Sequence, residues 1–472
     1  MVLVSPRIVI AGLRGGAGKT FLTVGITALL YERGYTVAPF KKGPDFIDTA
    51  WLSMSSGSQC FNLDMFLMTD DQIKRSFTMH SAKADIAVIE GNRGLYDGVD
   101  IDGSCSTANL SKLLDAAVIL VVDVTMATRT VAAIVKGCQV LDPDVNIKGV
   151  IINRVAGPRQ KALISGAIER YCGIPVIGSL PKLRDNPFPE RHMGLVPFHE
   201  RAHAEKAIAT VRSVVGDSVD IDALWKIAHD VRPLEGERES VPYEKGESLE
   251  GGGDPLRIGV IRDQSFWFYY PENLKQLQRM GAILIEINSL QDADFPDVDG
   301  LYIGGGFPET QARALAENRK FRCTLREKIE AGLPVYAECG GLLYLGESLI
   351  VEGSKYPMVG VVPLQFIMEG KPQGHGYTIL EVTRPNPYFR TGKIIKGHEF
   401  HYSRAIATGT DREMKDFVFT VRRGNGIGGD NDGFCKKNLL ATYTHIHGAG
   451  DSEWAESFIK RVRKVRNNID MI

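Results

Sequence analysis

Two segments that lie far apart in the chain carry residue types and spacings suited to chemistry. Residues 13–20 read LRGGAGKT, which is typical of a loop that binds phosphate groups. Residues 333–341 read LPVYAECGG, which is typical of a strand that ends in a tight turn and presents a thiol, that of Cys339. A phosphate loop combined with a thiol that splits glutamine predicts that ATP activates a carboxylate and that the released ammonia captures it.

The phosphate loop gives each of its polar groups a role. The backbone N–H groups of Gly15, Gly16 and Gly18 can converge on phosphate oxygens because no side chains obstruct them. Lys19 supplies positive charge, and the Thr20 hydroxyl is placed to contact Mg²⁺. A glycine-rich turn without a ligand is the alternative, but a strand is expected before the loop and a helix after it. We therefore predict ATP and Mg²⁺ as cofactors.

Four acids follow the predicted strands of the same region. Glu90 ends an apolar run at the carboxyl edge of the expected sheet, where open α/β sheets bind their ligands. It is a candidate metal ligand or water-positioning group, and capping of the next helix is the alternative. Asp45 and Asp48 lie in a charged turn, and Asp97 lies in the segment GLYDG. Each alone could be a solvated turn residue, but the four together predict a reaction site.

The thiol segment has the parts of a cysteine-dependent amidase. A helix that begins directly after Cys339 is expected to lower the thiol pKa. The N–H of Gly340 is placed to stabilise an oxyanion, and Gly305, in a run of three glycines after another predicted strand, is the second candidate donor. His445 is the candidate base, because such partners meet in space rather than in sequence.

Other histidines compete with this interpretation. His398 and His401 are alternative bases for the thiol, and together with His445 and His447 they form a set that could bind zinc. No cysteine lies at a spacing that would complete such a zinc site, so we disfavour it. Cys339 as an ordinary core cysteine is a further alternative.

Two α/β domains are needed to position these groups. Apolar runs alternate with helical stretches in the first part of the chain, which predicts a doubly wound parallel sheet. A charged and glycine-rich stretch then interrupts the pattern, and a second alternating run begins at residue 257. We predict an ATP-binding domain over residues 1–233, a linker over residues 234–256 and a thiol-bearing domain over residues 257–472.

Composition narrows the class of protein. The chain has 472 residues, of which 44% are hydrophobic and 24% charged, as in soluble globular proteins. Its net charge of −1 gives no electrostatic case for nucleic acid or a membrane surface as a partner. Seven scattered cysteines argue against a disulfide framework, and no signal peptide or membrane-spanning run is evident. We therefore expect a cytoplasmic protein.

Many segments together resemble the cobyrinic acid a,c-diamide synthase family over nearly the full length of the chain. They are KGPDFID (42–48), NLD (62–64), EG with GLYDG (90–98), STA (106–108), FYYPENL (268–274), GGGFPE (304–309), AECGG (337–341) and GHEFHYS (397–403). The resemblance implies an N-terminal P-loop ATP-binding domain and a C-terminal class I glutamine amidotransferase domain. It also implies ligation of ammonia from L-glutamine to the a and c acetate side chains of a tetrapyrrole, through an acyl phosphate. A homodimer is left open.

The resemblance also implies roles for single residues. Cys339 matches the glutaminase nucleophile of the family and His445 its activating histidine, whereas His447 stands where many related glutaminases place a glutamate. The acids Asp45, Asp48, Glu90 and Asp97 match acids that the family uses around ATP, metal and the carboxylate being activated. Asn153 matches a position that contacts adenine in related ATPases.

Departures from the family pattern leave the substrate open at this point. The loop RGGA (14–17), the pair NR (92–93) and the run KPQGHGY (371–377) differ from the usual residues and lie where a tetrapyrrole could be recognised. Cobyrinate is the first choice, and sirohaem or Ni-sirohydrochlorin is the alternative. A partitioning-type ATPase switch is an alternative from another class, suggested by Arg14, but it leaves the Cys339 domain unexplained.

Overall fold

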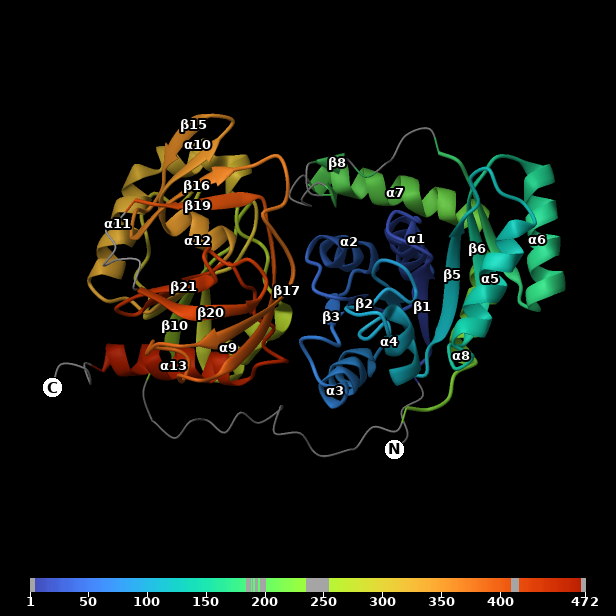
Figure 1. Ribbon diagram of the computed structural model, residues 1–472, viewed down its shortest axis with the longest axis horizontal. Helices are drawn as coiled ribbons and strands as arrows, with labels where there is room; N and C mark the ends of the chain where they lie inside the picture. The colour runs from blue at the N-terminus through green and yellow to red at the C-terminus, as the bar shows by residue number, and fades with distance from the viewer. Residues whose placement is uncertain are drawn as a thin grey trace. The chain divides into compact units, whose positions relative to one another are not determined.

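The chain divides into two compact units, Met1–Glu239 and Ser240–Ile472. The computed structural model (Figure 1) describes residues 5–183, 188, 190–191, 194–195, 201–234, 254–408 and 416–467. Most of the predicted linker, residues 235–253, lies outside the described residues. No helix in the described part of the chain is long and apolar enough to cross a membrane.

The first unit is built on a seven-stranded sheet with the order β3-β2-β4-β1-β5-β6-β7. Every neighbouring pair in it is parallel. The strands are β1 (Arg7–Gly12), β2 (Val37–Lys42), β3 (Phe61–Leu63), β4 (Ile86–Glu90), β5 (Ala117–Asp123), β6 (Ile147–Val155) and β7 (Val176–Pro181), with the short pair β8 (Glu190–Arg191) and β9 (Gly194–Leu195) beside the sheet. The chain leaves β1 in both directions along the sheet, which confirms the predicted doubly wound fold.

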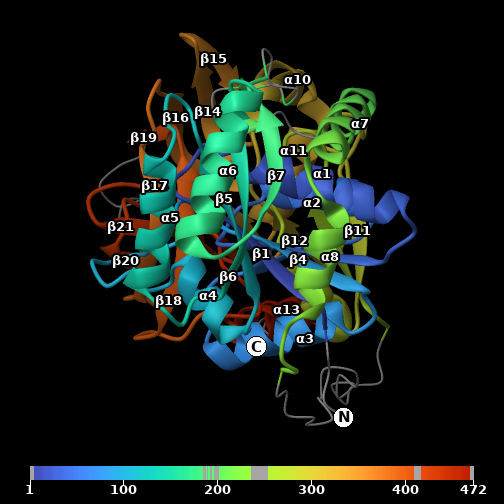
Figure 2. The ribbon, with the colours of Figure 1, turned by 90° about the vertical axis from the view of Figure 1, so that its right-hand side faces the viewer.

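Helices cover both faces of this sheet because its strands are apolar on both sides. They are α1 (Lys19–Glu32), α2 (Ile47–Ser56), α3 (Asp70–Ser81), α4 (Thr107–Leu113), α5 (Thr130–Leu141), α6 (Pro158–Cys172), α7 (Arg201–Ser218) and α8 (Ile221–His229). One core joins the sheet to α1, α2, α7 and α8. Figure 2 shows α5 and α6 on the opposite side of the sheet from α7 and α8.

The second unit contains a nine-stranded mixed sheet with the order β11-β10-β12-β13-β22-β21-β20-β17-β18. Its strands are β10 (Leu256–Ile261), β11 (Ala282–Ile287), β12 (Gly300–Ile303), β13 (Val335–Glu338), β17 (Gly374–Val382), β18 (Ile394–His401), β20 (Phe417–Arg423), β21 (Asn431–Lys436) and β22 (Leu439–Thr442). The first four strands and β22 are parallel, as expected for an α/β domain, and the others extend the sheet in antiparallel fashion.

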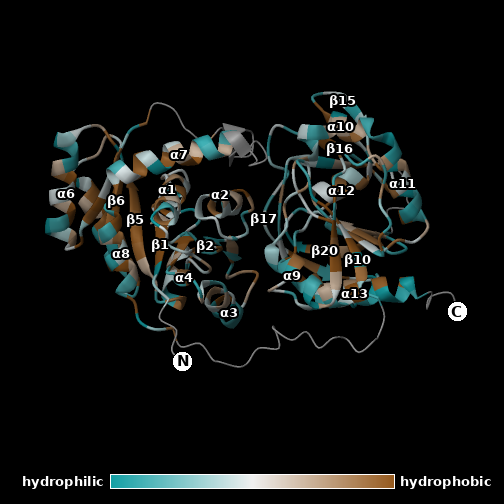
Figure 3. Cartoon of the chain, turned by 180° about the vertical axis from the view of Figure 1, so that it is seen from behind, coloured by the Kyte–Doolittle hydropathy of each residue, from teal (hydrophilic) through white to brown (hydrophobic). Residues whose placement is uncertain are grey.

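A four-stranded sheet and several helices complete the second unit. The sheet has the order β15-β14-β16-β19, formed by β14 (Gly346–Val351), β15 (Ser354–Pro357), β16 (Val362–Met368) and β19 (Ser403–Ala407). The helices are α9 (Pro271–Arg279), the 3₁₀ helix η1 (Pro308–Gln311), α10 (Ala312–Glu317), α11 (Arg319–Glu330), α12 (Gly340–Leu345) and α13 (Glu453–Arg466). Figure 3 shows apolar residues concentrated on the strands and polar residues on the outer helices.

Two strands of the seven-stranded sheet, β2 and β3, were not expected from the sequence. β2 reads VAPFKK, in which a proline and two lysines hide the apolar pattern, although all six residues are buried. β3 has the three residues FNL. Both depend on parallel pairing with neighbours for their stability, and β2 places Lys41 and Lys42 at the carboxyl edge of the sheet.

Candidate active sites

The phosphate loop connects β1 to α1 and follows the geometry that its glycines allow. Gly16 and Gly18 have φ angles of 71° and 98°, which residues with a Cβ atom rarely adopt. A Cβ atom on Gly18 would lie 2.3 Å from Nδ2 of Asn153. That Asn153 amide donates to the carbonyl of Ala17 at 2.9 Å, so the end of β6 holds the loop in place.

The two polar side chains that end the loop meet different partners. Lys19 Nζ donates to the carbonyls of Arg14 at 3.1 Å and Arg93 at 2.7 Å. Burial, together with the charge of Lys41, lowers the pKa of Lys19 to about 8. Thr20 Oγ1 donates to Glu90 Oε1 at 2.7 Å. The loop and the end of β4 therefore form one polar cluster.

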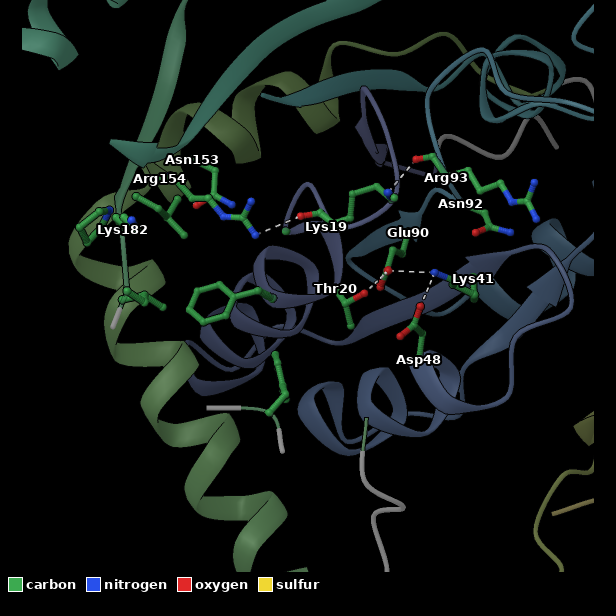
Figure 4. Close-up of a pocket in the computed structure, with 18 residues that line it drawn as sticks. Lys19, Thr20, Lys41, Asp48, Glu90, Asn92, Arg93, Asn153, Arg154 and Lys182 are labelled. Atoms are coloured by element: carbon green, nitrogen blue, oxygen red, sulfur yellow. Dashed lines mark hydrogen bonds and ion pairs between the residues drawn. The ribbon is translucent and has the colours of Figure 1, made fainter. Parts of the chain in front are cut away.

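A buried lysine stands at the centre of this cluster. Lys41 Nζ contacts Asp48 Oδ2 at 2.5 Å and Glu90 Oε1 at 2.8 Å (Figure 4). Burial works against its charge, but the two carboxylates outweigh burial and raise the pKa of Lys41 above its ordinary value. Lys41 is thus held as a cation between two of the predicted acids.

Glu90 has the features of a metal ligand. The residue is completely buried, and burial raises the pKa of its carboxyl to about 7 even though Lys41 opposes the shift. Oε1 accepts from Thr20 and Lys41, whereas Oε2 is buried without a hydrogen-bond partner. A carboxylate oxygen without a partner next to a threonine hydroxyl fits Mg²⁺, which takes few protein ligands and keeps several waters.

These groups line a pocket of about 680 Å³ in the first unit. The pocket brings together most of the predicted nucleotide-site residues, with cationic side chains around it (Figure 4). Its lining includes Gly15, Gly16, Gly18, Lys19, Thr20, Lys41, Asp48, Glu90, Asn92, Arg93, Asn153, Arg154 and Lys182. Positive charge of this kind suits a polyanion such as a nucleoside triphosphate.

Two of the predicted acids do not line this pocket and instead organise their own turns. Asp45 Oδ1 accepts the N–H of Asp48 at 2.7 Å at the start of α2, and burial together with the Asp48 charge raises its pKa to about 6. Asp97 Oδ2 accepts the N–H of Gly94 at 2.8 Å. A Cβ atom on Gly94 would lie 2.7 Å from the carbonyl oxygen of Leu13, so this turn packs against the phosphate loop.

The second site forms at the carboxyl edge of the other large sheet. Cys339 follows β13 directly and has a φ of 47°, a strained conformation for a residue with a side chain. Its N–H donates to the carbonyl of Thr442 at 2.8 Å, because β22 is the parallel neighbour of β13. Cys339 and His445 therefore leave the same edge of the sheet from adjacent strands.

The glycine-rich loop after β12 completes this site. A Cβ atom on Gly305 would lie 2.4 Å from Cε1 and 3.1 Å from Nε2 of His445. A Cβ atom on Gly340 would lie 2.9 Å from the backbone nitrogen of Gly306. Gly305 thus packs closely against the imidazole of His445, and Gly340, directly after Cys339, packs against the backbone of Gly306, so a side chain at either position would collide with its neighbours.

The thiol differs from its expected electrostatic state. Cys339 is only 5% exposed, and burial raises its pKa above the ordinary value, with the carboxylates of Glu309, Glu338 and Glu399 acting in the same direction. The expected lowering by the helix is wrong for this structure, because α12 has only six residues and the thiol is enclosed. A proton acceptor close to the sulfur is therefore essential for reactivity.

Comparison with known proteins agrees with the two sites. Residues 8–196 match the family model of the CobQ/CobB/MinD/ParA nucleotide binding domain, and residues 257–453 match that of the CobB/CobQ-like glutamine amidotransferase domain. Cobyrinate a,c-diamide synthase of Magnetococcus marinus is 42% identical to this chain, with 98% of each covered. The enzymes of the same name from Archaeoglobus fulgidus and Caldanaerobacter subterraneus are 41% and 38% identical, with 97% and 96% of this chain and 98% and 97% of theirs covered.

The chain belongs to the cobyrinate a,c-diamide synthase family. Two other histidines of the second unit, His398 and His401, pack against aromatic rings. His398 stacks on His445 with ring centroids 4.9 Å apart, and its Nδ1 lies 3.1 Å from the hydroxyl of Tyr270. His401 stacks on Tyr443 with centroids 3.6 Å apart. No group of three or more histidine, cysteine, aspartate or glutamate side chains that could hold a metal ion occurs within the described residues.

Sequence reasoning did not select two residues that lie at the centres of these sites, Lys41 and Glu338. Lys41 lies in the charged stretch that we interpreted as a turn. Had β2 been recognised as a strand beside β4, Lys41 would have been expected next to Glu90. Glu338 precedes Cys339, and its Oε2 lies 3.4 Å from Nδ1 of His445. Its position directly beside Cys339 was the available signal.

Proposed function

We propose that this protein amidates the a and c acetate carboxylates of cobyrinate, with ATP as the energy source and L-glutamine as the nitrogen donor. Its curated relatives carry the name cobyrinate a,c-diamide synthase and match the chain almost from end to end. The observation that carries the proposal is the presence, in one chain, of a cationic nucleotide pocket and a separate cysteine–histidine site. Neither site alone would account for an ATP-dependent amidation that takes its nitrogen from glutamine.

The first unit would activate the carboxylate. The N–H groups of the phosphate loop and the charge of Lys19 would bind the triphosphate, and Lys41 would face the transferred phosphoryl group from its place beside Glu90. Transfer of the γ-phosphoryl group to the substrate carboxylate gives an acyl phosphate and ADP. Attack by ammonia then forms the amide and releases phosphate. Thr20 and Glu90 would hold Mg²⁺, which neutralises phosphate charge when bound.

The second unit would supply the ammonia. His445 takes the proton of the Cys339 thiol, and the thiolate attacks the side-chain carbonyl of glutamine. The N–H groups of Gly305 and Gly340 are placed to stabilise the resulting oxyanion. Ammonia leaves with the proton returned by His445, and water hydrolyses the thioester to glutamate. The magnesium ion, the cytoplasmic location and a homodimer stay predictions.

Removal of the thiol separates the two half-reactions. Cys339→Ala should abolish glutamine hydrolysis and glutamine-dependent amidation, while ammonium chloride still supports amidation, because the first unit is unchanged.

Product masses after incubation with cobyrinate, sirohaem or Ni-sirohydrochlorin should show two amide additions on cobyrinate. Amidation of only a sirohydrochlorin derivative would overturn the substrate, and failure of ammonia to rescue the variant would overturn the division of labour.

A further inference from the structure

A buried carboxylate contacts the imidazole of His445, and it belongs to the residue that precedes the nucleophile. Oε2 of Glu338 lies 3.4 Å from Nδ1 of His445, and both residues are almost fully buried. The contact joins two neighbouring strands, because β13 pairs with β22 in a register that places Glu338 opposite Thr442. The acid and the base thus approach each other through the sheet rather than through the sequence.

Further hydrogen bonds fix the Glu338 carboxylate in this position. Oε1 accepts the N–H of Ile446 at 3.1 Å, and Oε2 accepts the hydroxyl of Tyr302 at 3.1 Å. The Tyr302 hydroxyl in turn accepts from the Asn273 amide at 3.2 Å. A buried carboxylate held on both oxygens presents a fixed acceptor to Nδ1.

The opposite edge of the imidazole faces the oxyanion loop. A Cβ atom on Gly305 would lie 2.4 Å from Cε1 and 3.1 Å from Nε2 of His445. Gly306, in the same loop, packs against Gly340, the residue that follows Cys339. With the Nδ1 proton donated to Glu338, the unprotonated nitrogen of the ring is Nε2, on the edge that faces this loop.

His447, which stands where many related glutaminases place a glutamate, contacts other groups. Nε2 of His447 lies 3.8 Å from Oε2 of Glu272, and its ring packs on Tyr270 with centroids 4.3 Å apart. Burial lowers the pKa of His447 to about 3, so it is neutral at ordinary pH and does not supply the negative charge that would stabilise an imidazolium.

We propose that Glu338 is the positioning residue of the glutaminase site and completes a triad with Cys339 and His445. It fixes the tautomer of His445 and stabilises the imidazolium that forms when Nε2 takes the thiol proton. The proposal rests on the proposed function, since it assigns a role within glutamine hydrolysis. It places the acid beside the nucleophile in sequence, instead of two residues after the histidine.

Glu338 acts on the pKa of the Cys339 thiol in two ways. The direct effect raises this pKa, and the effect through His445 lowers it. The ionisable groups that interact with Cys339 include Glu309, Glu338, Glu399 and Tyr443, and the three carboxylates raise the thiol pKa through their negative charge. Through His445, the same Glu338 carboxylate stabilises the imidazolium and so favours the thiolate. His398 stacks on the other face of His445 and is neutral, since burial lowers its pKa.

Alkylation of Cys339 at different pH values tests the proposal in the full-length protein. Iodoacetamide reacts with the thiolate, and the modified peptide identifies the cysteine. Glu338→Gln should move the alkylation midpoint to higher pH and lower kcat for glutamine hydrolysis about 100-fold with little change in KM. Glu338→Asp should recover part of kcat. Glu309→Gln, the matched control, removes a charge that acts only directly and should move the midpoint to lower pH.

The opposite sign would overturn the proposal. If Glu338→Gln moves the midpoint to lower pH, as Glu309→Gln does, or leaves kcat unchanged, Glu338 is only a buried charge.

Should the Glu338→Gln variant fail to fold, Tyr302→Phe provides a second test, because it removes one hydrogen bond to Oε2 of Glu338. It should give a smaller shift of the midpoint to higher pH, and no shift would count against the triad. Ammonia-supported amidation should persist in every variant. Glutamine hydrolysis that survives Cys339→Ala would instead refute the proposed function.

Discussion

At the scale of single residues, the buried cation Lys41 depends most on its neighbours. Its side chain is 3% exposed, and its charge is balanced by the carboxylates of Asp48 and Glu90. Lys41→Met would leave the buried Glu90 carboxylate beside the partly buried carboxylate of Asp48 without a cation, so we expect a loss of about 3 kcal/mol in the free energy of unfolding. Amidation should fall with either nitrogen donor, because the cation at the pocket is gone, while glutamine hydrolysis remains.

Urea unfolding and product assays with glutamine or ammonium chloride would measure these effects. Lys112→Met is the matched control, since Lys112 forms a partly exposed pair with Asp142 at 2.5 Å and its loss should change stability by no more than about 1 kcal/mol. Full amidation activity in the Lys41 variant would show that its charge serves the fold alone.

At the scale of elements, the loop after β12 and the turn after β13 depend on close backbone approach. Gly305→Ala would place a methyl group 2.4 Å from Cε1 of His445, so the imidazole must leave its present position. We expect kcat for glutamine hydrolysis to fall about 100-fold because proton transfer is lost. Ammonia-supported amidation should be unchanged.

Steady-state kinetics of both reactions would test this, with Gly370→Ala as the control. Gly370 has an ordinary backbone conformation, and a Cβ atom there meets no atom within 4 Å, so its substitution should leave both reactions intact. Glutamine hydrolysis at the normal rate in Gly305→Ala would mean that His445 is not the base.

At the scale of the whole molecule, each compact unit has its own apolar core. The first surrounds the parallel sheet, and two others lie in the second unit. We expect calorimetry to resolve two unfolding transitions. A non-hydrolysable ATP analogue with Mg²⁺ at 100 times its dissociation constant should stabilise only one of them, by about 2.7 kcal/mol.

Thr20→Ala should weaken that stabilisation, because it removes a hydroxyl that contacts Glu90 and faces the nucleotide pocket. Cys339→Ala should leave it intact, because the thiol belongs to the other unit. A single transition that the analogue shifts as a whole would contradict the independence of the two units.

The sequence by itself determined the parts of this protein that are encoded locally. The phosphate loop, the nucleophile turn and the apolar strands are read from contiguous residues, since glycine conformation and strand burial depend on near neighbours. The doubly wound first domain, the class of the second and the family follow from these segments. Cys339, Lys19 and Thr20 were predicted as site residues in this way.

Only the tertiary structure decided which distant groups meet. Lys41 joins Asp48 and Glu90 because β2 pairs with β4, and Glu338 contacts His445 because β13 pairs with β22. Burial of Cys339 reversed the expected shift of its pKa. Strand pairing and burial arise from contacts between segments far apart in the chain, and no local pattern of residue types specifies them.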